Sequence, residues 1–343
     1  MFIKNCWYVA AWDHELLEGK LLERTILNES ILLYRTAAGD AIALNNKCAH
    51  RHAPLSLGRR EGDCIRCMYH GLKYDESGRC VEIPGQTTIP RHLRVRTYPV
   101  VERKRWVWIW MGDPAKADFG LIPDTFSLQH PEWRMKPGYV HYRANHLLIS
   151  DNLLDFSHLS YVHEATLGGS PDIAQTRAST ERIERGVRIR REILNTAPAP
   201  YHQRLAQFSG AVDRWFVYDY LIPGVLLMES GVRASDPGAR EREKTLIFHS
   251  CQAITPETDT ATHYFFASAN EAWLDAEATE HIYRSVVSAF QEDRRMIEAQ
   301  QQLISTTAPA DMIPLLSDGA LGHFRLLMQR TLESERAAVP ETA

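Results

Sequence analysis

Short apolar runs bounded by turn-forming residues fill the first third of the chain. Residues 31–34 and 41–44 flank Ala38-Gly39-Asp40, which predicts a β-hairpin. Glu76-Ser77-Gly78 indicates a second turn, and residues 106–110 have the aromatic and β-branched content of a strand. The pattern therefore predicts a small antiparallel β domain.

The hydrophobic pattern changes in the rest of the chain. Residues 147–162 have helical spacing, residues 225–228 and 263–266 are typical of strands, and residues 279–303 predict a long helix. The chain of 343 residues is long enough for two hydrophobic cores. We expect an α+β protein with domains at residues 1–118 and 119–343.

Composition narrows the range of partners. Lys and Arg total 39 against 43 Asp and Glu, a formal charge of -4, which gives no general attraction to nucleic acid. The first 13 residues lack the features of a signal peptide, and no segment approaches the roughly 18 uncharged apolar residues of a membrane span. We expect a cytoplasmic protein that binds a small molecule or a protein, without nucleic acid or membrane as partner.

Two Cys-His pairs form the first candidate metal site. Cys48-Ala49-His50 is followed by Cys67-Met68-Tyr69-His70. In a Rieske [2Fe–2S] centre two thiolates hold one iron and two imidazoles hold the other, so each of two loops delivers one Cys and one His. The pairs Cys48 with His50 and Cys67 with His70 match this requirement.

A structural zinc site is the alternative for the same loops. Cys64 and Cys67 form a C-x-x-C, and zinc accepts mixed Cys and His ligands, so spacing alone leaves zinc open. If the loops hold an iron–sulfur cluster, Cys64 is a thiol that packs beside the site without binding metal. We expect the cysteines without metal-ligand neighbours to be core residues: Cys6, Cys80 and Cys251.

A second candidate metal site lies in residues 152–163. His158 and His163 supply two of the three ligands of the two-histidine, one-carboxylate site that non-haem iron enzymes use. On an unbroken helix a five-residue step rotates about 140°, too far for both to reach one ion. The helix should therefore break or loosen between Leu159 and Val162.

The predicted C-terminal helix offers the carboxylate. Asp293 lies in the middle of an otherwise largely apolar stripe, and a buried carboxylate needs a cation or a strong donor. The stripe contains Ile282, Val286, Phe290, Ile297 and Gln300. Neighbouring Glu292 points about 100° away, which predicts a solvated side chain. The alternative for Asp293 is a salt bridge to an arginine.

These residues resemble the Rieske non-haem iron oxygenase family, in particular its vanillate O-demethylase and toluenesulfonate methyl-monooxygenase oxygenase subunits. The resemblance covers nearly the whole chain. It rests on Asn5-Cys6-Trp7-Tyr8-Val9-Ala10, Cys48-Ala49-His50-Arg51, Ala53-Pro54-Leu55, Cys67-Met68-Tyr69-His70-Gly71-Leu72, Trp108-Ile109-Trp110, Gly112-Asp113-Pro114, Asp151-Asn152-Leu153-Leu154-Asp155, Thr255-Pro256-Glu257-Thr258 and Glu292-Asp293.

The resemblance implies an N-terminal Rieske β domain, a helix-grip catalytic domain and a homotrimer. It implies that Asp155 is a bridge between metal centres, meeting His70 of a neighbouring subunit so that electrons pass between subunits. Such a carboxylate fixes the orientation of two iron-bound imidazoles. An exposed acid on a helix is the alternative for Asp155. We count Asp155 and Asn152 as candidate catalytic residues.

The resemblance also implies a reaction cycle. A separate flavin and iron–sulfur reductase, with or without a ferredoxin, takes electrons from NADH. The [2Fe–2S] cluster relays them to a mononuclear Fe(II), where O2 is used to oxidise the substrate. The expected ligands are Cys48, His50, Cys67 and His70 for the cluster, and His158, His163 and Asp293 for the mononuclear iron.

The expected substrate is a substituted aromatic acid, oxidised by O-demethylation or methyl hydroxylation. We expect the pocket to be lined by residues from the middle of the catalytic domain: Leu226, Met228, His249, Cys251, Phe265 and Phe290. This chain has Gln252 at the position where the dicamba-demethylating relative has a substrate-contacting histidine, so we do not expect it to share that substrate. Alternatives are an aromatic ring hydroxylase or dioxygenase of the same family, a non-catalytic Rieske electron carrier, and a zinc-binding module.

Overall fold

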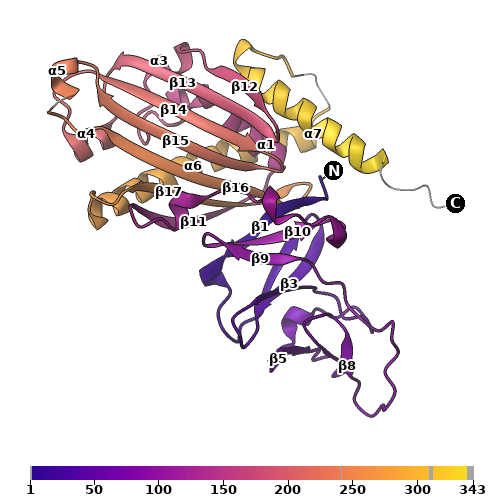
Figure 1. Ribbon diagram of the computed structural model, residues 1–343. Helices are drawn as coiled ribbons and strands as arrows, with labels where there is room; N and C mark the ends of the chain where they lie inside the picture. Colours follow the sequence, from indigo (N-terminus) through magenta and orange to yellow (C-terminus); the bar gives the residue numbers. More distant parts are fainter. Residues whose placement is uncertain (1, 241, 309–311, 338–343) are drawn as a thin grey trace. The chain divides into compact units, whose positions relative to one another are not determined.

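The computed structural model describes residues 2–240, 242–308 and 312–337, which form two compact units (Figure 1). One unit contains the chain up to Pro123 together with Thr255–Asp259, and the other contains Asp124–Ile254 and the chain from Thr260 onward. The boundary lies after Pro123 and not at the expected residue 118. The reason is that Trp7 Nε1 donates to the carbonyl of Asp118 at 2.8 Å and the Trp7 ring stacks on Phe119.

The N-terminal unit contains three antiparallel sheets, in the strand orders β1-β10-β9, β2-β3-β4 and β5-β6-β7-β8. Their strands are β1 Cys6–Trp12, β2 Leu22–Ile26, β3 Glu29–Arg35, β4 Ala41–Asn45, β5 Arg59–Glu61, β6 Cys64–Arg66, β7 Lys73–Tyr74, β8 Cys80–Glu82, β9 Val100–Arg103 and β10 Trp106–Met111. The predicted hairpin is confirmed, since Leu33 pairs with Ala43 across β3 and β4. The predicted second turn is also confirmed, and Gly78 has a φ of +76° there.

The second unit is built on one seven-stranded antiparallel sheet in the order β11-β17-β16-β15-β14-β13-β12. Its strands are β11 Trp133–Tyr142, β12 Ser179–Ile183, β13 Gly186–Thr196, β14 Val212–Leu221, β15 Val225–Ala234, β16 Leu246–Thr258 and β17 Ala261–Glu271. The strands predicted at residues 225–228 and 263–266 lie in β15 and β17. The expected α+β class is confirmed.

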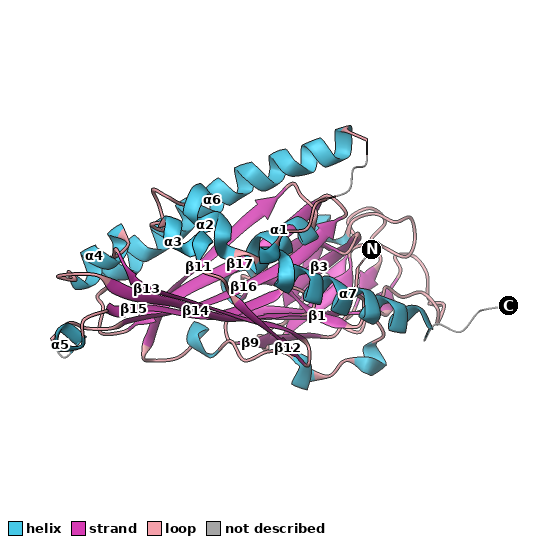
Figure 2. Ribbon diagram, turned by 90° about the horizontal axis from the view of Figure 1, so that it is seen from above, coloured by secondary structure: helices cyan, strands magenta, loops and turns pink. Residues whose placement is uncertain are grey.

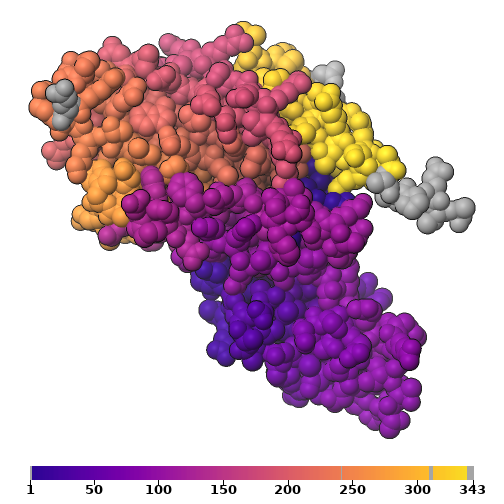
Figure 3. Space-filling view, viewed as in Figure 1, coloured from indigo at the N-terminus to yellow at the C-terminus, as the bar shows by residue number. Residues whose placement is uncertain are grey.

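Helices cover one face of this sheet (Figure 2). They are α1 His146–Leu154, α2 Leu159–Val162, α3 Pro171–Gln175, α4 Pro200–Ala206, α5 Pro237–Arg240, α6 Ala276–Thr306 and α7 Gly319–Ala337. The predicted long helix is α6, with the expected burial of Ile282, Phe290 and Ile297, whereas Gln300 is exposed. Helix α7, yellow at the surface in Figure 3, was not predicted.

Alternation along β14 creates the face that carries the site. Tyr218 stacks on Phe156 at 4.6 Å between ring centroids, and the Tyr220 hydroxyl donates to Ser150 of α1 at 2.7 Å. Arg214 and Phe216 share this parity and therefore lie on the same, helix-covered face. None of the described helices combines the length and the apolar character that a membrane span requires.

Candidate active site

Two histidines and one aspartate converge beneath α6. His158 ends a short 3-10 helix, Phe156–His158, His163 caps the C-terminus of α2, and Asp293 lies in the middle of α6. Asp293 Oδ1 lies 3.5 Å from His158 Nε2 and 3.2 Å from His163 Nε2. Donor atoms of all three side chains lie within 4.8 Å of one another, close enough to ligate one ion.

The expected break or loosening between Leu159 and Val162 is wrong, because these four residues form one α-helical turn, α2. The chain leaves helical geometry on either side of it. Asp155 has an extended backbone (φ -130°, ψ 101°), and His163 ends the turn with a ψ of 25°. The two imidazoles can face one point because each stands at a boundary of the helical turn.

Each imidazole is oriented by an acceptor at its far nitrogen. His158 Nδ1 lies 2.7 Å from the carbonyl oxygen of Asp155, and His163 Nδ1 lies 2.9 Å from Glu292 Oε2. Glu292 also accepts from the hydroxyl of Thr166 at 2.8 Å. When Nδ1 donates its proton in this way, Nε2 keeps the lone pair that binds a metal.

The expectation of a solvated Glu292 is therefore wrong. Its side chain is 19% exposed and is engaged with His163 and Thr166. Glu292 points to a different side of α6 from Asp293, as expected, but the loop after α2 covers that side as well. A contact between residues 129 positions apart in the chain leaves no local pattern in the sequence.

Burial and charge suit this triad to a cation. Asp293 is 3% exposed, and Asn152 Nδ2 donates to its Oδ1 at 3.1 Å. Within the described residues the ion-pair partners of Asp293 are the two histidines and no arginine, contrary to the salt-bridge alternative. Burial lowers the pKa of His158, which favours the neutral form that a ligand needs. Burial opposes charge on His163 too, but hydrogen bonding to Asp293 and Glu292 raises its pKa.

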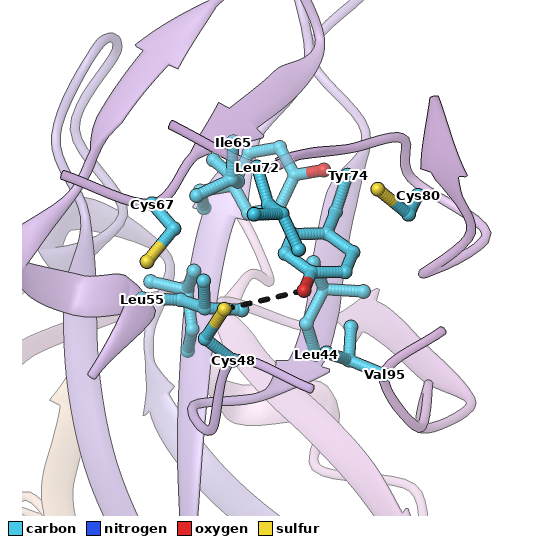
Figure 4. Packing of buried hydrophobic residues seen from close by; sticks show 11 residues of the cluster. Leu44, Cys48, Leu55, Ile65, Cys67, Leu72, Tyr74, Cys80 and Val95 are labelled. Carbon is cyan, nitrogen blue, oxygen red and sulfur yellow. Dashed lines mark hydrogen bonds between the residues drawn. The ribbon is translucent and has the colours of Figure 1, made fainter. Parts of the chain in front are cut away.

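The Cys-His pairs lie together in the N-terminal unit. Cys48 and Cys67 are buried in one apolar cluster, where the Cys48 thiol lies 3.2 Å from the Tyr74 hydroxyl (Figure 4). The rings of His50 and His70 are 4.6 Å apart between centroids, and both side chains are exposed. Two adjacent thiols beneath two adjacent imidazoles fit a cluster with one iron on each pair.

Two tight turns of the same kind position these pairs. In the first loop His52 N donates to Cys48 O at 2.9 Å, and in the second Gly71 N donates to Cys67 O at 2.9 Å. His52 and Gly71 both have positive φ, of 59° and 77°. A Cβ at Gly71 would lie 2.6 Å from Pro84 Cγ, so glycine fits this turn.

The geometry does not favour the zinc alternative. Four ligands of one tetrahedral zinc ion must crowd around a single point. In the described part of the chain, Cys48, His50, Cys67 and His70 do not belong to any group of three or more donors within 4.8 Å, and neither does Cys64. The wider set fits a cluster with two metal ions.

Family models match both units. The Rieske [2Fe-2S] domain model matches residues 6–99, and the model of the vanillate O-demethylase oxygenase C-terminal domain matches residues 142–334. The chain belongs to the Rieske non-haem iron oxygenases of the vanillate O-demethylase type. Membership in this family supports a Rieske cluster and a mononuclear iron as the metal groups of this Rieske oxygenase. It also supports an oxygenase component and not a simple electron carrier.

Curated relatives align along almost the full length of this Rieske oxygenase. The iron–sulfur subunit of the toluene-4-sulfonate monooxygenase system of Comamonas testosteroni is 49% identical over 342 residues, covering 98% of each chain. The vanillate O-demethylase oxygenase subunit of a Pseudomonas species is 34% identical, covering 98% of this chain and 97% of the relative. A crystal structure of dicamba monooxygenase bound to 3,6-dichlorosalicylic acid superposes with a TM-score of 0.89 at 32% identity, covering 98% and 99% of the two chains.

A pocket opens on the triad of this Rieske oxygenase. Its lining includes His158, His163 and Asp293 and is otherwise mostly apolar and aromatic. The apolar wall consists of Leu153, Phe156, Leu159, Leu167, Phe216, Met228, Phe248, Ile282, Val286 and Phe290. Such a wall suits an aromatic ring.

Only two of the six expected pocket residues, Met228 and Phe290, line this pocket. On β16 the pocket is lined by Phe248, Ser250 and Gln252, so His249 and Cys251 face the other side of the sheet. On β17 Ser268 lines the pocket, and Phe265, an odd number of positions away, points to the opposite face of the sheet. Leu226 is fully buried but does not line the pocket. Sequence alone did not reveal which parity faces the helices.

Two residues of the site were not predicted from the sequence: Glu292, the partner of His163, and Arg214, which lines the pocket. A signal existed for Arg214, because it is a charged residue at a core-facing position of the strand Val212–Leu221.

Proposed function

We propose that this chain is the terminal oxygenase component of a monooxygenase that oxidises the methyl or methoxy group of a substituted aromatic acid. One observation carries the proposal: a largely apolar pocket has His158, His163 and Asp293 in its wall. The substrate named for the relative at 49% identity, toluene-4-sulfonate, is a methylated aromatic acid and supports this substrate class.

Electrons would come from NADH through a separate flavin and iron–sulfur reductase. The imidazoles of His50 and His70 are exposed, and so are the adjacent Met68 and Tyr69, at 54% and 63%. An exposed edge of this kind suits docking of a redox partner, because it leaves a short path to the cluster.

Bound iron would supply the O2 chemistry, and the chain holds its ligands in place and keeps bulk water out. Glu292 and the Asp155 carbonyl fix the two imidazoles, and Asn152 holds the carboxylate of Asp293. One oxygen atom of O2 enters the substrate methyl group, while the other leaves as water with two electrons and two protons. A methoxy group then yields a hemiacetal that loses formaldehyde, whereas an aryl methyl group yields a stable alcohol.

We infer that the active form is a homotrimer in which Asp155 meets His70 of a neighbouring subunit. The Asp155 carboxylate accepts from Ser157 N at 2.9 Å and from its hydroxyl at 2.7 Å, and Arg191 Nη2 lies 3.4 Å away. These contacts hold the carboxylate in one orientation while it remains 17% exposed. The same residue would thus orient His158 by its carbonyl and the neighbour's imidazole by its carboxylate.

Aerobic turnover with a compatible reductase tests the function. The panel contains methylated, methoxylated and sulfonated aromatics, and oxygen uptake is measured together with formaldehyde, alcohol and phenol. Alcohol or formaldehyde in step with oxygen supports the proposal. A phenol product would indicate ring hydroxylation, and no oxygen uptake by iron-loaded protein with any compound would contradict an oxygenase.

A further inference from the structure

The pocket wall contains a buried cation, Arg214, that the proposed chemistry does not use. Arg214 lies on β14, is 2% exposed and lines the same pocket as the triad. A fully buried arginine is uncommon unless a carboxylate or another anion accompanies it.

Protein groups satisfy only part of the Arg214 guanidinium. Nη1 donates to the carbonyl of Gly168 at 3.0 Å, and Tyr201 lines the same pocket as the guanidinium. Its Nε has no hydrogen-bond partner in the described part of the chain, and no carboxylate there pairs with it. Arg214 therefore retains both an unused donor and an uncompensated charge.

The neighbouring strand provides a comparison. Arg191 of β13 is also buried, at 6% exposed, but it donates to Ile173 O at 2.6 Å and pairs with Asp155 at 3.4 Å. Removing a charge from water without a compensating partner is strongly unfavourable. The fold supplies an anion for Arg191 and none for Arg214, so the missing anion must come from a ligand.

Groups around Arg214 are suited to an aromatic anion. Tyr201 and Phe216 line the pocket with it, the Arg214 guanidinium carbon lies 5.8 Å from the centre of the Phe216 ring, and the Tyr201 hydroxyl can donate its proton to a ligand. Burial first, and then the charge of Arg214, lower the pKa of the buried His202 well below its ordinary value, so His202 adds no competing charge.

Building on the proposed function, we propose that Arg214 binds the sulfonate or carboxylate group of the aromatic substrate, with Tyr201 as a second donor. The guanidinium Nε and Nη groups form the flat pair of donors that matches two oxygens of such an anion. The ring then lies along the apolar wall between Arg214 and the triad. Arg214 selects aromatic acids over neutral aromatics of the same size.

Binding to the iron-loaded, resting holoenzyme tests this without turnover. Calorimetry measures the Kd of para-toluenesulfonate, para-toluate and the neutral isostere para-toluenesulfonamide. We expect the tighter anion to bind roughly 100-fold more strongly than the sulfonamide. Whichever of the two anions binds more tightly identifies the acid group that the site fits.

Variants locate the preference. Arg214→Gln should remove the anion preference, and Arg214→Lys should keep part of it because the charge remains without the flat donor pair. The matched control is Arg188→Gln on β13, an arginine whose Nε and Nη2 are both held by Asp219 at 2.6 and 2.8 Å and which lies outside this pocket lining. It should bind like the wild type. Circular dichroism and the visible absorbance of the cluster verify that each variant is folded.

Equal affinity of the wild type for the sulfonamide and for both anions, para-toluenesulfonate and para-toluate, would overturn the proposal even if no Arg214 variant folds. A preference that survives in folded Arg214→Gln would overturn it as well. The proposed function fails separately: anions would bind through Arg214, but no compound would be oxidised. Conversely, equal turnover of neutral and anionic aromatics would leave the oxygenase intact and reject the anion site.

Discussion

The two candidate metal sites are built in opposite ways. The Rieske site takes its four ligands from two short turns close together in the sequence, and its imidazoles, His50 and His70, are exposed. The mononuclear site joins the α2 region to α6, and His163 and Asp293 are 2% and 3% exposed. One site suits electron entry at a surface, whereas the other suits oxidation in a dry pocket.

This contrast has an energetic consequence. The Rieske loops are held by local backbone hydrogen bonds, such as Cys67 N to Leu72 O at 2.8 Å, so they keep their shape independently of distant residues. The mononuclear site depends on α6 packing against the α2 region. We therefore expect substitutions in α6 to weaken one metal site and leave the other unchanged.

The largest effect should come from Asp293→Ala. This change removes the only carboxylate of the triad and leaves two imidazoles, which bind a divalent ion much more weakly. Substrate oxidation measured as oxygen uptake and product should fall to background. The visible spectrum of the cluster serves as the control and should not change, and turnover near the wild-type rate would contradict the ligand assignment.

Asp155→Asn should slow electron delivery by about 10–100-fold while both metals stay bound. The amide keeps the size of the side chain but loses the charge proposed to hold the neighbouring subunit's imidazole, while the Asp155 carbonyl still orients His158. Stopped-flow absorbance of the reduced cluster during a single turnover measures the rate.

Asp172→Asn is the matched control for Asp155→Asn. Asp172 lies in the first turn of α3 and, like Asp155, accepts from neighbouring hydroxyls, those of Ser170 and Thr196 at 2.9 and 2.6 Å. In the Asp172→Asn variant the reduced cluster should be oxidised at the wild-type rate. Equal rates in Asp155→Asn and the wild type would reject the bridge.

Glu292→Gln should weaken iron binding about 10–100-fold, because the amide is a poorer acceptor for His163 Nδ1. Equilibrium dialysis against iron measures the affinity of the mononuclear site. Glu298→Gln on the same helix, whose carboxylate pairs with Arg143 and Arg294 at 3.1 and 3.0 Å, should leave it unchanged. Equal losses of iron affinity in Glu292→Gln and Glu298→Gln would show that the effect comes from α6 as a whole and not from the contact of Glu292 with His163.

Tyr74→Phe should have the smallest effect and should act on the other site. The Tyr74 hydroxyl lies 3.2 Å from Cys48 Sγ, and a hydrogen bond to a cluster thiolate raises the reduction potential. Its loss should lower the potential by about 50 mV, the equivalent of one net hydrogen bond. Tyr34→Phe, which removes a hydroxyl bonded to the Asp63 carbonyl at 2.9 Å, is the control for spectroelectrochemical titration. An unchanged potential in Tyr74→Phe would show that the contact does not tune the cluster.

The same contrast explains what could be predicted from the sequence. The pairs Cys48 with His50 and Cys67 with His70 are local patterns, and the period of α6 singled out Asp293 as buried. The partner of His163 could not be found in this way, since Glu292 meets it only after the chain folds. Thr255–Asp259 belongs to the N-terminal unit for the same kind of reason: its Thr255 hydroxyl donates to Val9 O at 2.7 Å, 246 positions away.

The substrate pocket shows a second limit. Strand period is visible in the sequence, but when both faces of a strand are apolar it does not say which one faces the helices. His249 and Cys251 were therefore placed on the wrong side, one position away from Ser250 and Gln252.

Metal and sulfide analysis of the purified chain tests the central claim that one polypeptide assembles two separate iron centres. The wild type should contain about three iron atoms and two acid-labile sulfides per chain. Asp293→Ala should lose one iron and keep both sulfides, whereas Cys67→Ser should lose the sulfides and keep the iron bound at His158, His163 and Asp293. Wild-type protein with two irons and two sulfides, unchanged by Asp293→Ala, would contradict the account.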